Sequence, residues 1–216
     1  MAFKQTSITI GFLVLLAYSS AAQNCQLANR PAPGWSEQLR QLMPDCDNRV
    51  SSPDGKLIFQ IGADQKIRIL NEGRSLALDG NLDLEPPAVI SWSPRSDVFF
   101  LNDGQGSGLS SQLRLFYVFG PRAVENGRVN RSISDAFRQE NECEKSAEPP
   151  NVWGLGWSED GQKLYVMAQT IVGGICGNAE RFRGYVVNAH TGAIERVLTT
   201  SQTRSRFRQL LPENMR

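Results

Sequence analysis

Three stretches of the chain share one alternation of apolar and polar residues around a turn. They are Val50–Phe59, Ile90–Phe100 and Leu155–Val166. Each begins with apolar side chains on alternate positions, passes through a serine and a short polar run, and returns as a second apolar segment. Such alternation places one side of an extended strand in the core, so each stretch predicts a β-hairpin.

Ser52, Ser93 and Ser158 mark equivalent corners of these hairpins. The first two lie 41 residues apart and the last two 65 apart, which is one period plus an insertion. Asp-Gly follows the first and third serines, and it makes tight turns because glycine accepts a positive φ. Ser96-Asp97 takes its place in the second copy, where we expect a less tight turn. The side chains expected on buried faces are Ala88, Ile90 and Trp92 in the second copy and Trp153, Leu155 and Trp157 in the third.

Further strands are expected after each corner. Returning strands fit Leu57–Ile61, Val98–Asn102 and Lys163–Gln169, third strands fit Lys66–Leu70, Gln112–Phe119 and Arg181–Val187, and fourth strands fit Ser75–Leu78 and Ile194–Thr199. The fourth strand is indistinct in the middle copy. Four short antiparallel strands in about 40 residues are typical of one propeller blade. We therefore predict an all-β fold of antiparallel four-stranded blade repeats, arranged as a small or partial β-propeller.

The Trp-Ser-Pro-Asp-Gly-Lys type of hairpin and the later Thr191-Gly192 turn resemble the blade repeats of the TolB-type β-propeller, a relative of the WD-repeat propellers. The resemblance covers roughly residues 48–200. Proline is missing from the third copy, glycine from the second and tryptophan from the first. The resemblance implies a propeller frame and a habit of binding other proteins, and it carries no functional residues over to this chain.

Three blades are fewer than the four to eight of closed propellers, and an open row would leave sheet edges unprotected. Four outcomes are consistent with the sequence. The N-terminal arm and C-terminal tail build a degenerate fourth blade, two chains form a six-bladed homodimer, a partner covers the open side, or the strands collapse into a β-sandwich.

The first residues predict export. Lys4, the apolar run Ile8–Tyr18 and the small residues Ser20-Ala21-Ala22 form the pattern of a secretory signal. The run is shorter than the ~20 residues that a membrane span requires, and no later stretch is long enough, so we expect no transmembrane span after cleavage. Cys25 lies close behind the run, as in a lipoprotein, but Asn24 precedes it where lipid attachment usually needs a small residue. A periplasmic or secreted location follows.

The remaining chain divides into three parts. We expect an N-terminal arm with a short helix at 23–47, the blade domain at 48–200 and a C-terminal arm at 201–216, after a signal peptide at 1–22. The helix is expected over Ser36–Met43, ended by Pro44. The C-terminal arm is basic, which we interpret as solvated surface, and it is expected to dock through Phe207, Leu210 and Leu211.

Charge gives no sign of a nucleic-acid partner. Cleavage after Ala22 removes Lys4, one of the 23 basic residues, and none of the 22 acidic ones, so the mature chain is formally neutral.

The cysteines Cys25, Cys46, Cys143 and Cys176 all remain in the mature chain. An even count in an exported chain predicts disulfides, with three possible pairings. We favour Cys25–Cys46 and Cys143–Cys176, because each pair closes a local loop. None of them has the C-x-x-C spacing, so redox catalysis and a zinc site are poorly supported.

Residues that carry chemistry are sparse. His190 is the only histidine, and it lies in a predicted surface turn without converging partners. Asp79–Glu85 spaces oxygen donors like a calcium loop, but Leu84 and Ile90 stand where an EF-hand needs glycine and glutamate. Asp103–Ser111 is glycine-rich, yet it joins two strands and lacks a basic residue, unlike a phosphate-binding loop. We therefore expect no catalytic residue, cofactor or metal.

The insertion Val124–Pro150 is the least regular part of the mature chain. It contains Cys143 and the glycosylation sequon Asn130-Arg131-Ser132, which has meaning only in a eukaryotic host. Together with Thr170–Arg181, which contains Cys176, it is expected to form a disulfide-stapled protrusion that makes specific contacts.

These features favour an exported, non-enzymatic binding protein whose loops, held on a rigid β frame, contact a protein partner. Two alternatives remain. A propeller-type hydrolase requires a cleft where two or more carboxylates converge with shifted pKa values. A structural subunit of an envelope oligomer has open sheets that pair only between chains.

Overall fold

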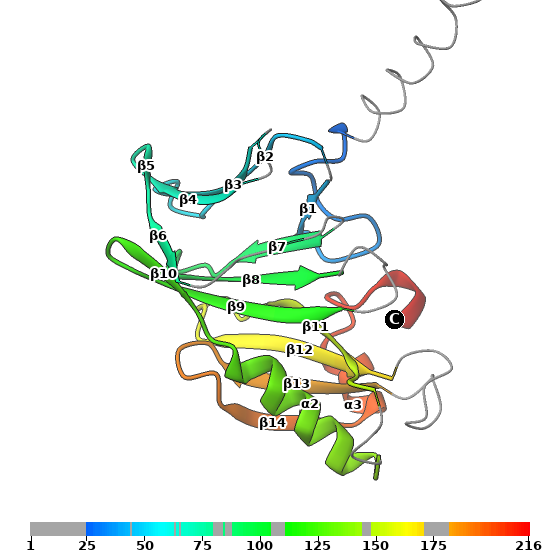
Figure 1. Cartoon of the computed structure of the whole chain (residues 1–216). Helices are drawn as coiled ribbons and strands as arrows, with labels where there is room; N and C mark the ends of the chain where they lie inside the picture. The colour runs from blue at the N-terminus through cyan, green and yellow to red at the C-terminus, as the bar shows by residue number, and fades with distance from the viewer. Residues whose placement is uncertain are drawn as a thin grey trace, which may run out of the picture.

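The computed structural model describes residues 25–43, 45–62, 64, 66–79, 84, 88–104, 111–143, 148–170 and 182–216. This part of the chain is mostly β and contains three sheets (Figure 1). Two sheets are four-stranded and antiparallel, and one is six-stranded and mixed. The described residues do not close into a propeller ring.

The strands of the first sheet run in the order β2-β3-β4-β5, with bounds Asn48–Ser51, Leu57–Ile61, Ile67–Asn71 and Arg74–Ser75. The third sheet has the order β11-β12-β13-β14, with bounds Asn151–Trp157, Lys163–Gln169, Phe182–Asn188 and Ile194–Leu198. Both are meanders, in which each strand pairs with its neighbour in sequence.

The second sheet is a meander of the same kind with a strand added at each edge. Its central strands are β7 (Ala88–Trp92), β8 (Val98–Asp103), β9 (Gln112–Phe119) and β10 (Arg122–Glu125). On one side β1 (Arg40–Leu42) pairs antiparallel with β7, and on the other β6 (Ala77–Asp79) pairs parallel with β10. The fourth strand that was indistinct in the sequence is therefore present as β10.

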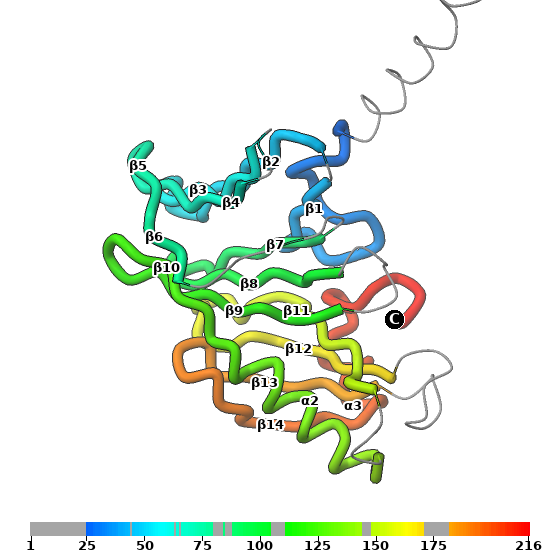
Figure 2. The backbone as a smooth tube through the Cα atoms, viewed as in Figure 1, coloured from blue at the N-terminus to red at the C-terminus, as the bar shows by residue number. Residues whose placement is uncertain are grey.

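The three sheets lie one after another, with the second sheet in the middle (Figure 2). One face of the second sheet packs on the first sheet through side chains such as Phe59, Ile69 and Phe99. Its other face packs on the third sheet through Phe100, Val166 and others. This arrangement explains the burial of every residue in β7 and β8, because both faces of these strands are covered.

The helix predicted over Ser36–Met43 is wrong. This segment forms a turn followed by β1, whose register pairs Arg40 with Ile90 and Leu42 with Ala88. Leu39 and Leu42 are fully buried there. Pairing with an available sheet edge and burial of these leucines outweigh a local helical preference, which amounts to tenths of a kcal/mol per residue.

The insertion is more regular than expected, because it contains the helix α2 (Arg128–Glu140). The helix packs against β9 of the second sheet and against β11 and β12 of the third (Figure 1). It buries Val129, Ile133 and Phe137, which recur every four residues. This helix is therefore part of the core and does not protrude.

One predicted buried face is also wrong. Trp153 and Leu155 belong to a cluster on the outer face of the third sheet, whereas Trp157 faces the second sheet. The strand β11 has an irregularity between Gly154 and Gly156. An extra residue in a strand moves all later side chains to the other face, so Trp157 occupies the same side of its sheet as Trp92 does in the second copy.

The C-terminal arm docks as expected. It forms the helix α3 (Thr200–Arg206) and a 3-10 turn at Glu213–Met215, and Phe207 and Leu211 are buried against the outer face of the third sheet. Within the described ranges, no helix has the length and apolar character needed to cross a membrane.

The Cys25–Cys46 disulfide is confirmed. Cys143 is disulfide-bonded as well, but its expected partner Cys176 lies outside the described residues, so that pairing stays a prediction. The signal peptide at 1–22 also lies outside them.

Candidate functional site

The three corner serines have the same backbone hydrogen bonds. The N–H of the serine donates to the carbonyl five residues later, at 2.8, 2.8 and 3.0 Å for Ser52, Ser93 and Ser158. Its carbonyl accepts from the N–H three residues later, at 2.9, 2.8 and 2.9 Å. The serines therefore occupy equivalent turns, as the repeat predicted.

The second turn is as tight as the other two, contrary to expectation. Gly55 and Gly161 have φ values of 74° and 69°, and Ser96 adopts 63° at the equivalent position. A positive φ costs a non-glycine residue about 1–2 kcal/mol. Ser96 gains a contact in exchange, because its Oγ accepts from the N–H of Asp54 in the first corner at 3.1 Å.

The corner carboxylates stabilise two of these turns. Ser52 Oγ donates to Asp54 and Ser158 Oγ donates to Asp160, at 2.7 and 2.6 Å. A backbone N–H also donates to each carboxylate, from Lys56 in the first corner and two residues after Asp160 in the third. These hydrogen bonds favour the ionised form and lower the pKa of Asp54 and of Asp160.

A tryptophan just before the corner joins each later sheet to the one before it. Trp92 Nε1 donates to the carbonyl of Val50 at 3.1 Å, and Trp157 Nε1 donates to Ser91 Oγ at 3.0 Å. Val50 and Ser91 are themselves equivalent, each lying two residues before its corner serine. Equivalent positions are therefore joined twice, once through a main-chain carbonyl and once through a hydroxyl, and in the first copy the tryptophan position is occupied by Ser51.

The N-terminal arm contributes a further set of contacts at this end of the sheets. Ser36 Oγ donates to the carbonyl of Leu155 at 3.1 Å, and Gln38 Oε1 accepts from the N–H of Trp157 at 2.8 Å. A Cβ at Gly156 would lie 2.6 Å from Gln38 Oε1, so this approach requires glycine. The arm is thus fixed against β11 as well as β7.

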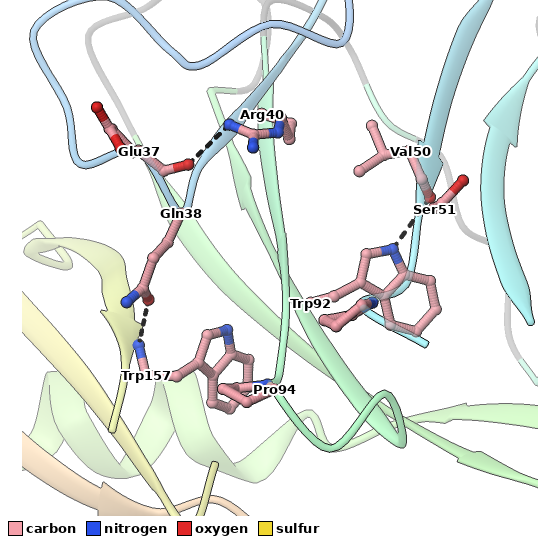
Figure 3. Close-up of a pocket in the computed structure, with 9 residues that line it drawn as sticks. Glu37, Gln38, Arg40, Val50, Ser51, Trp92, Pro94 and Trp157 are labelled. Atoms are coloured by element: carbon pink, nitrogen blue, oxygen red, sulfur yellow. Dashed lines mark hydrogen bonds between the residues drawn. The ribbon is translucent and has the colours of Figure 1, made fainter. Parts of the chain in front are cut away.

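A pocket of about 460 Å³ opens where the arm, the first two corners and the two indoles meet (Figure 3). Trp92, Trp157 and Val50 form apolar walls, and Pro53 and Pro94 stand exposed at the rim. The remaining lining residues are Glu37, Gln38, Arg40 and Ser51.

Arg40 is the cation of this pocket. Its Nη1 donates to the carbonyl of Glu37 at 2.7 Å. Within the described ranges, no carboxylate lies within ion-pair distance of Arg40. Glu37 is exposed and lies on the opposite side of the view from Ser51 (Figure 3). The pocket therefore has apolar walls and one guanidinium with donors to spare.

The groups with depressed pKa values do not line this pocket. Asp54 and Asp160 serve their own turns, and Arg68 lowers the pKa of Asp64 to about 2 through an exposed ion pair. Glu37 is the one carboxylate among the described residues that line the pocket. That lining does not supply the pair of carboxylates that the hydrolase hypothesis requires.

The structure places the other sequence candidates apart from the pocket. His190 lies in the exposed turn between β13 and β14, where its N–H donates to Asn188 Oδ1. Asn130 lies in α2, and its Oδ1 accepts from the N–H of Leu113. No group of three metal-ligating side chains exists in the ranges that the structure covers.

The two candidate loops are only partly described. Asp79 ends β6 and Leu84 is buried, while most of the run between Gly80 and Pro87 lies outside the described residues. The glycine-rich segment joins β8 to β9 as predicted, with residues 105–110 outside the described part. Asp103 at its start pairs with Arg114, which also binds Glu125.

Sequence reasoning missed the contribution of the arm to this site. Glu37, Gln38 and Arg40 were assigned to the short helix of the N-terminal arm, which gave no reason to place them beside the corners. The polar residues Gln38 and Arg40 on either side of the apolar Leu39 could have indicated a strand, because this alternation is typical of one. The two tryptophans of the pocket, Trp92 and Trp157, were expected to be buried, and they are.

Comparison with known proteins adds no relative. No protein-family model matches the chain, and a search of curated proteins finds no match to its sequence.

Proposed function

We propose that this chain is an exported, non-enzymatic binding protein that holds a protein partner in the pocket at the corners of its sheets. The three sheets would serve as blades of a partial β-propeller of the TolB-like type. The observation that carries the proposal is the pocket itself, built from equivalent positions of successive sheets and from the N-terminal arm.

Two features support a binding role, and a third supports export. The frame is rigid, since its corners are joined by hydrogen bonds between Trp92 and Val50 and between Trp157 and Ser91. The rim presents exposed prolines on short turns, which lose little entropy on contact. The Cys25–Cys46 disulfide agrees with an oxidising compartment.

The test uses the mature protein, residues 23–216, as bait in envelope extract, with cross-linking. Pro53→Trp and Pro94→Trp place a bulky side chain at the rim of the pocket. Glu159→Trp is the matched control, because Glu159 follows Ser158 as Pro94 follows Ser93 but does not line the pocket. We expect a stoichiometric partner with the wild-type chain and the control, and loss of it with the proline variants.

Recovery of no partner, or of the same partner with all three variants, contradicts the proposal. Native mass spectrometry of the same preparations reports chain number. An obligate oligomer without bound partner would favour the structural-subunit alternative instead.

A further inference from the structure

The strands β2, β7 and β11, which begin the three meanders, end beside the pocket. The corner serines Ser52, Ser93 and Ser158 direct their N–H groups to the returning strands. Main-chain groups alternate in direction along an antiparallel strand, so the preceding residue directs its N–H and carbonyl away from that partner. The preceding residues are Ser51, Trp92 and Trp157, and all three line the pocket.

One of these three N–H groups already has an acceptor. The N–H of Trp157 donates to the amide oxygen of Gln38 (Figure 3). The equivalent N–H groups of Ser51 and Trp92 lie on the side away from β3 and β8, and no described strand pairs with either residue on that side. The third position is thus occupied by an oxygen from the arm, and the first two are open.

Arg40 stands beside these open donors. Among the described residues, the Arg40 guanidinium donates one hydrogen bond, and its acceptor is the neutral carbonyl of Glu37 rather than a carboxylate. A guanidinium with free N–H groups pairs best with a planar oxyanion, to which it donates two parallel hydrogen bonds. Backbone N–H groups add donors of fixed direction and no charge.

We propose that the pocket recognises a carboxylate of the partner polypeptide, bound by the Arg40 guanidinium and by the N–H groups of Ser51 and Trp92. The carboxylate belongs to a chain terminus or to an acidic side chain, and Pro53 and Pro94 contact the apolar residues around it. This inference rests on the proposed binding function and specifies its ligand chemistry.

The negative charge of Glu37 opposes the binding of a carboxylate in this pocket. Its carboxylate also lines the pocket and repels an anion, but the side chain is exposed, so water and salt screen it. It restricts the carboxylate to the Ser51 side of Arg40.

The test is an NMR titration of the ¹⁵N-labelled mature protein with synthetic peptides. One pair is acetyl-Ala-Val-Pro-Val with a free C-terminus and the same peptide as its amide. The other pair is amidated acetyl-Ala-Val-Asp-Val and its Asn counterpart. We expect saturable shifts of the Ser51 and Trp92 amide signals with the carboxylate member of at least one pair, and at least tenfold weaker binding of its neutral partner. The pair that responds identifies the source of the carboxylate.

Two independent variants complete the test. Arg40→Gln keeps a donor for the Glu37 carbonyl but removes the charge, and Ser51→Pro removes one N–H on the edge that does not pair with β3. Each is expected to weaken binding tenfold or more, whereas Ser51→Ala, which keeps the N–H, binds like the wild type. Equal binding of acid and amide peptides, unchanged affinity of both variants, or no shift at millimolar peptide overturns the inference.

Its failure is distinguishable from that of the binding function. If Arg40→Gln still captures the envelope partner while Pro94→Trp does not, the pocket binds a partner by other chemistry. In that case the carboxylate inference falls and the proposed function stands.

Discussion

Asn102 and Gly154 exchange two buried hydrogen bonds across the boundary between the second and third sheets. Asn102 Nδ2 donates to the carbonyl of Gly154 at 2.8 Å, and the N–H of Gly154 donates to Asn102 Oδ1 at 2.7 Å. A Cβ on Gly154 would lie within 2.8 Å of the Phe100 ring, so the two sheets approach this closely only because the residue is glycine.

Replacement of Asn102 is therefore expected to destabilise the fold. Asn102→Ala leaves both backbone groups of Gly154 buried and unpaired, and each such group costs about 1–3 kcal/mol. We expect the free energy of unfolding to fall by about 2–4 kcal/mol, measured by urea denaturation. Gln162→Ala, at an exposed position, serves as the control and should change little. Equal stability of Asn102→Ala and the wild type would contradict this account.

The glycines of the first and third corners should differ in their tolerance of alanine. Both have a positive φ, so both variants lose about 1–2 kcal/mol. A Cβ at Gly55 meets nothing within 4 Å, whereas one at Gly161 lies 2.9 Å from Arg95 Cγ and 3.0 Å from Ser93 Oγ. We expect Gly161→Ala to lose about 1–3 kcal/mol more than Gly55→Ala in thermal or urea unfolding. The reverse order would show that the corners do not touch.

The indole hydrogen bond between Trp157 and Ser91 should appear as a coupling energy. Trp157→Phe removes the Nε1 donor, and Ser91→Ala removes the buried acceptor. In a double-mutant cycle we expect about 1 kcal/mol of favourable coupling between the two positions. The pair Trp157 and Gln162, which share no hydrogen bond, provides the reference cycle, for which additivity is expected. Additive effects in both cycles would show that this hydrogen bond does not help to join the second and third sheets.

Acid should weaken the fold through three aspartates. The pKa values of Asp54, Asp64 and Asp160 are lowered in the folded chain, that of Asp64 to about 2. Because the folded pKa lies below the unfolded value of 3.8, their contribution is complete above about pH 4 and is lost as the pH falls towards 2.

The measurement is the urea midpoint between pH 5 and pH 2. The triple variant Asp54→Asn, Asp64→Asn and Asp160→Asn is expected to lose less stability over this range than the wild type. Asp135→Asn, on the exposed side of α2, controls for the removal of a charge. An identical acid dependence of the triple variant and the wild type contradicts the assignment.

Much of the β structure could be predicted from local pattern. The strands β3, β9 and β12 have the predicted bounds, because short apolar runs between polar turns determine them. The helix α2 was not predicted, although Val129, Ile133 and Phe137 recur every four residues. The high charge of the segment and its cysteine were interpreted as signs of a loop. The alternation of β11 was misread because a bulge does not alter the composition of a strand.

The candidate site depends on contacts that no local pattern contains. Gln38 and Trp157 are 119 residues apart in the chain, and their hydrogen bond exists only because β1 pairs with β7. Arg40 was assigned to the predicted short helix of the arm for the same reason. The corner serines recur in the sequence and can be recognised by their spacing. The arm residues Gln38 and Arg40 occur once, so no repeat indicates where they pack.

The serine at position 51 gives the row of sheets a polarity. Tryptophan stands at that place wherever a preceding sheet offers an acceptor, and a small polar residue stands where none precedes it. The opposite end is finished by Phe207 and Leu211 of the C-terminal arm. A chain of this kind is consequently expected to accept a duplicate of its middle unit, which bonds to the sheet before it through Trp92 and to the sheet after it through Ser91. A duplicate of the third unit would instead place the C-terminal arm inside the array.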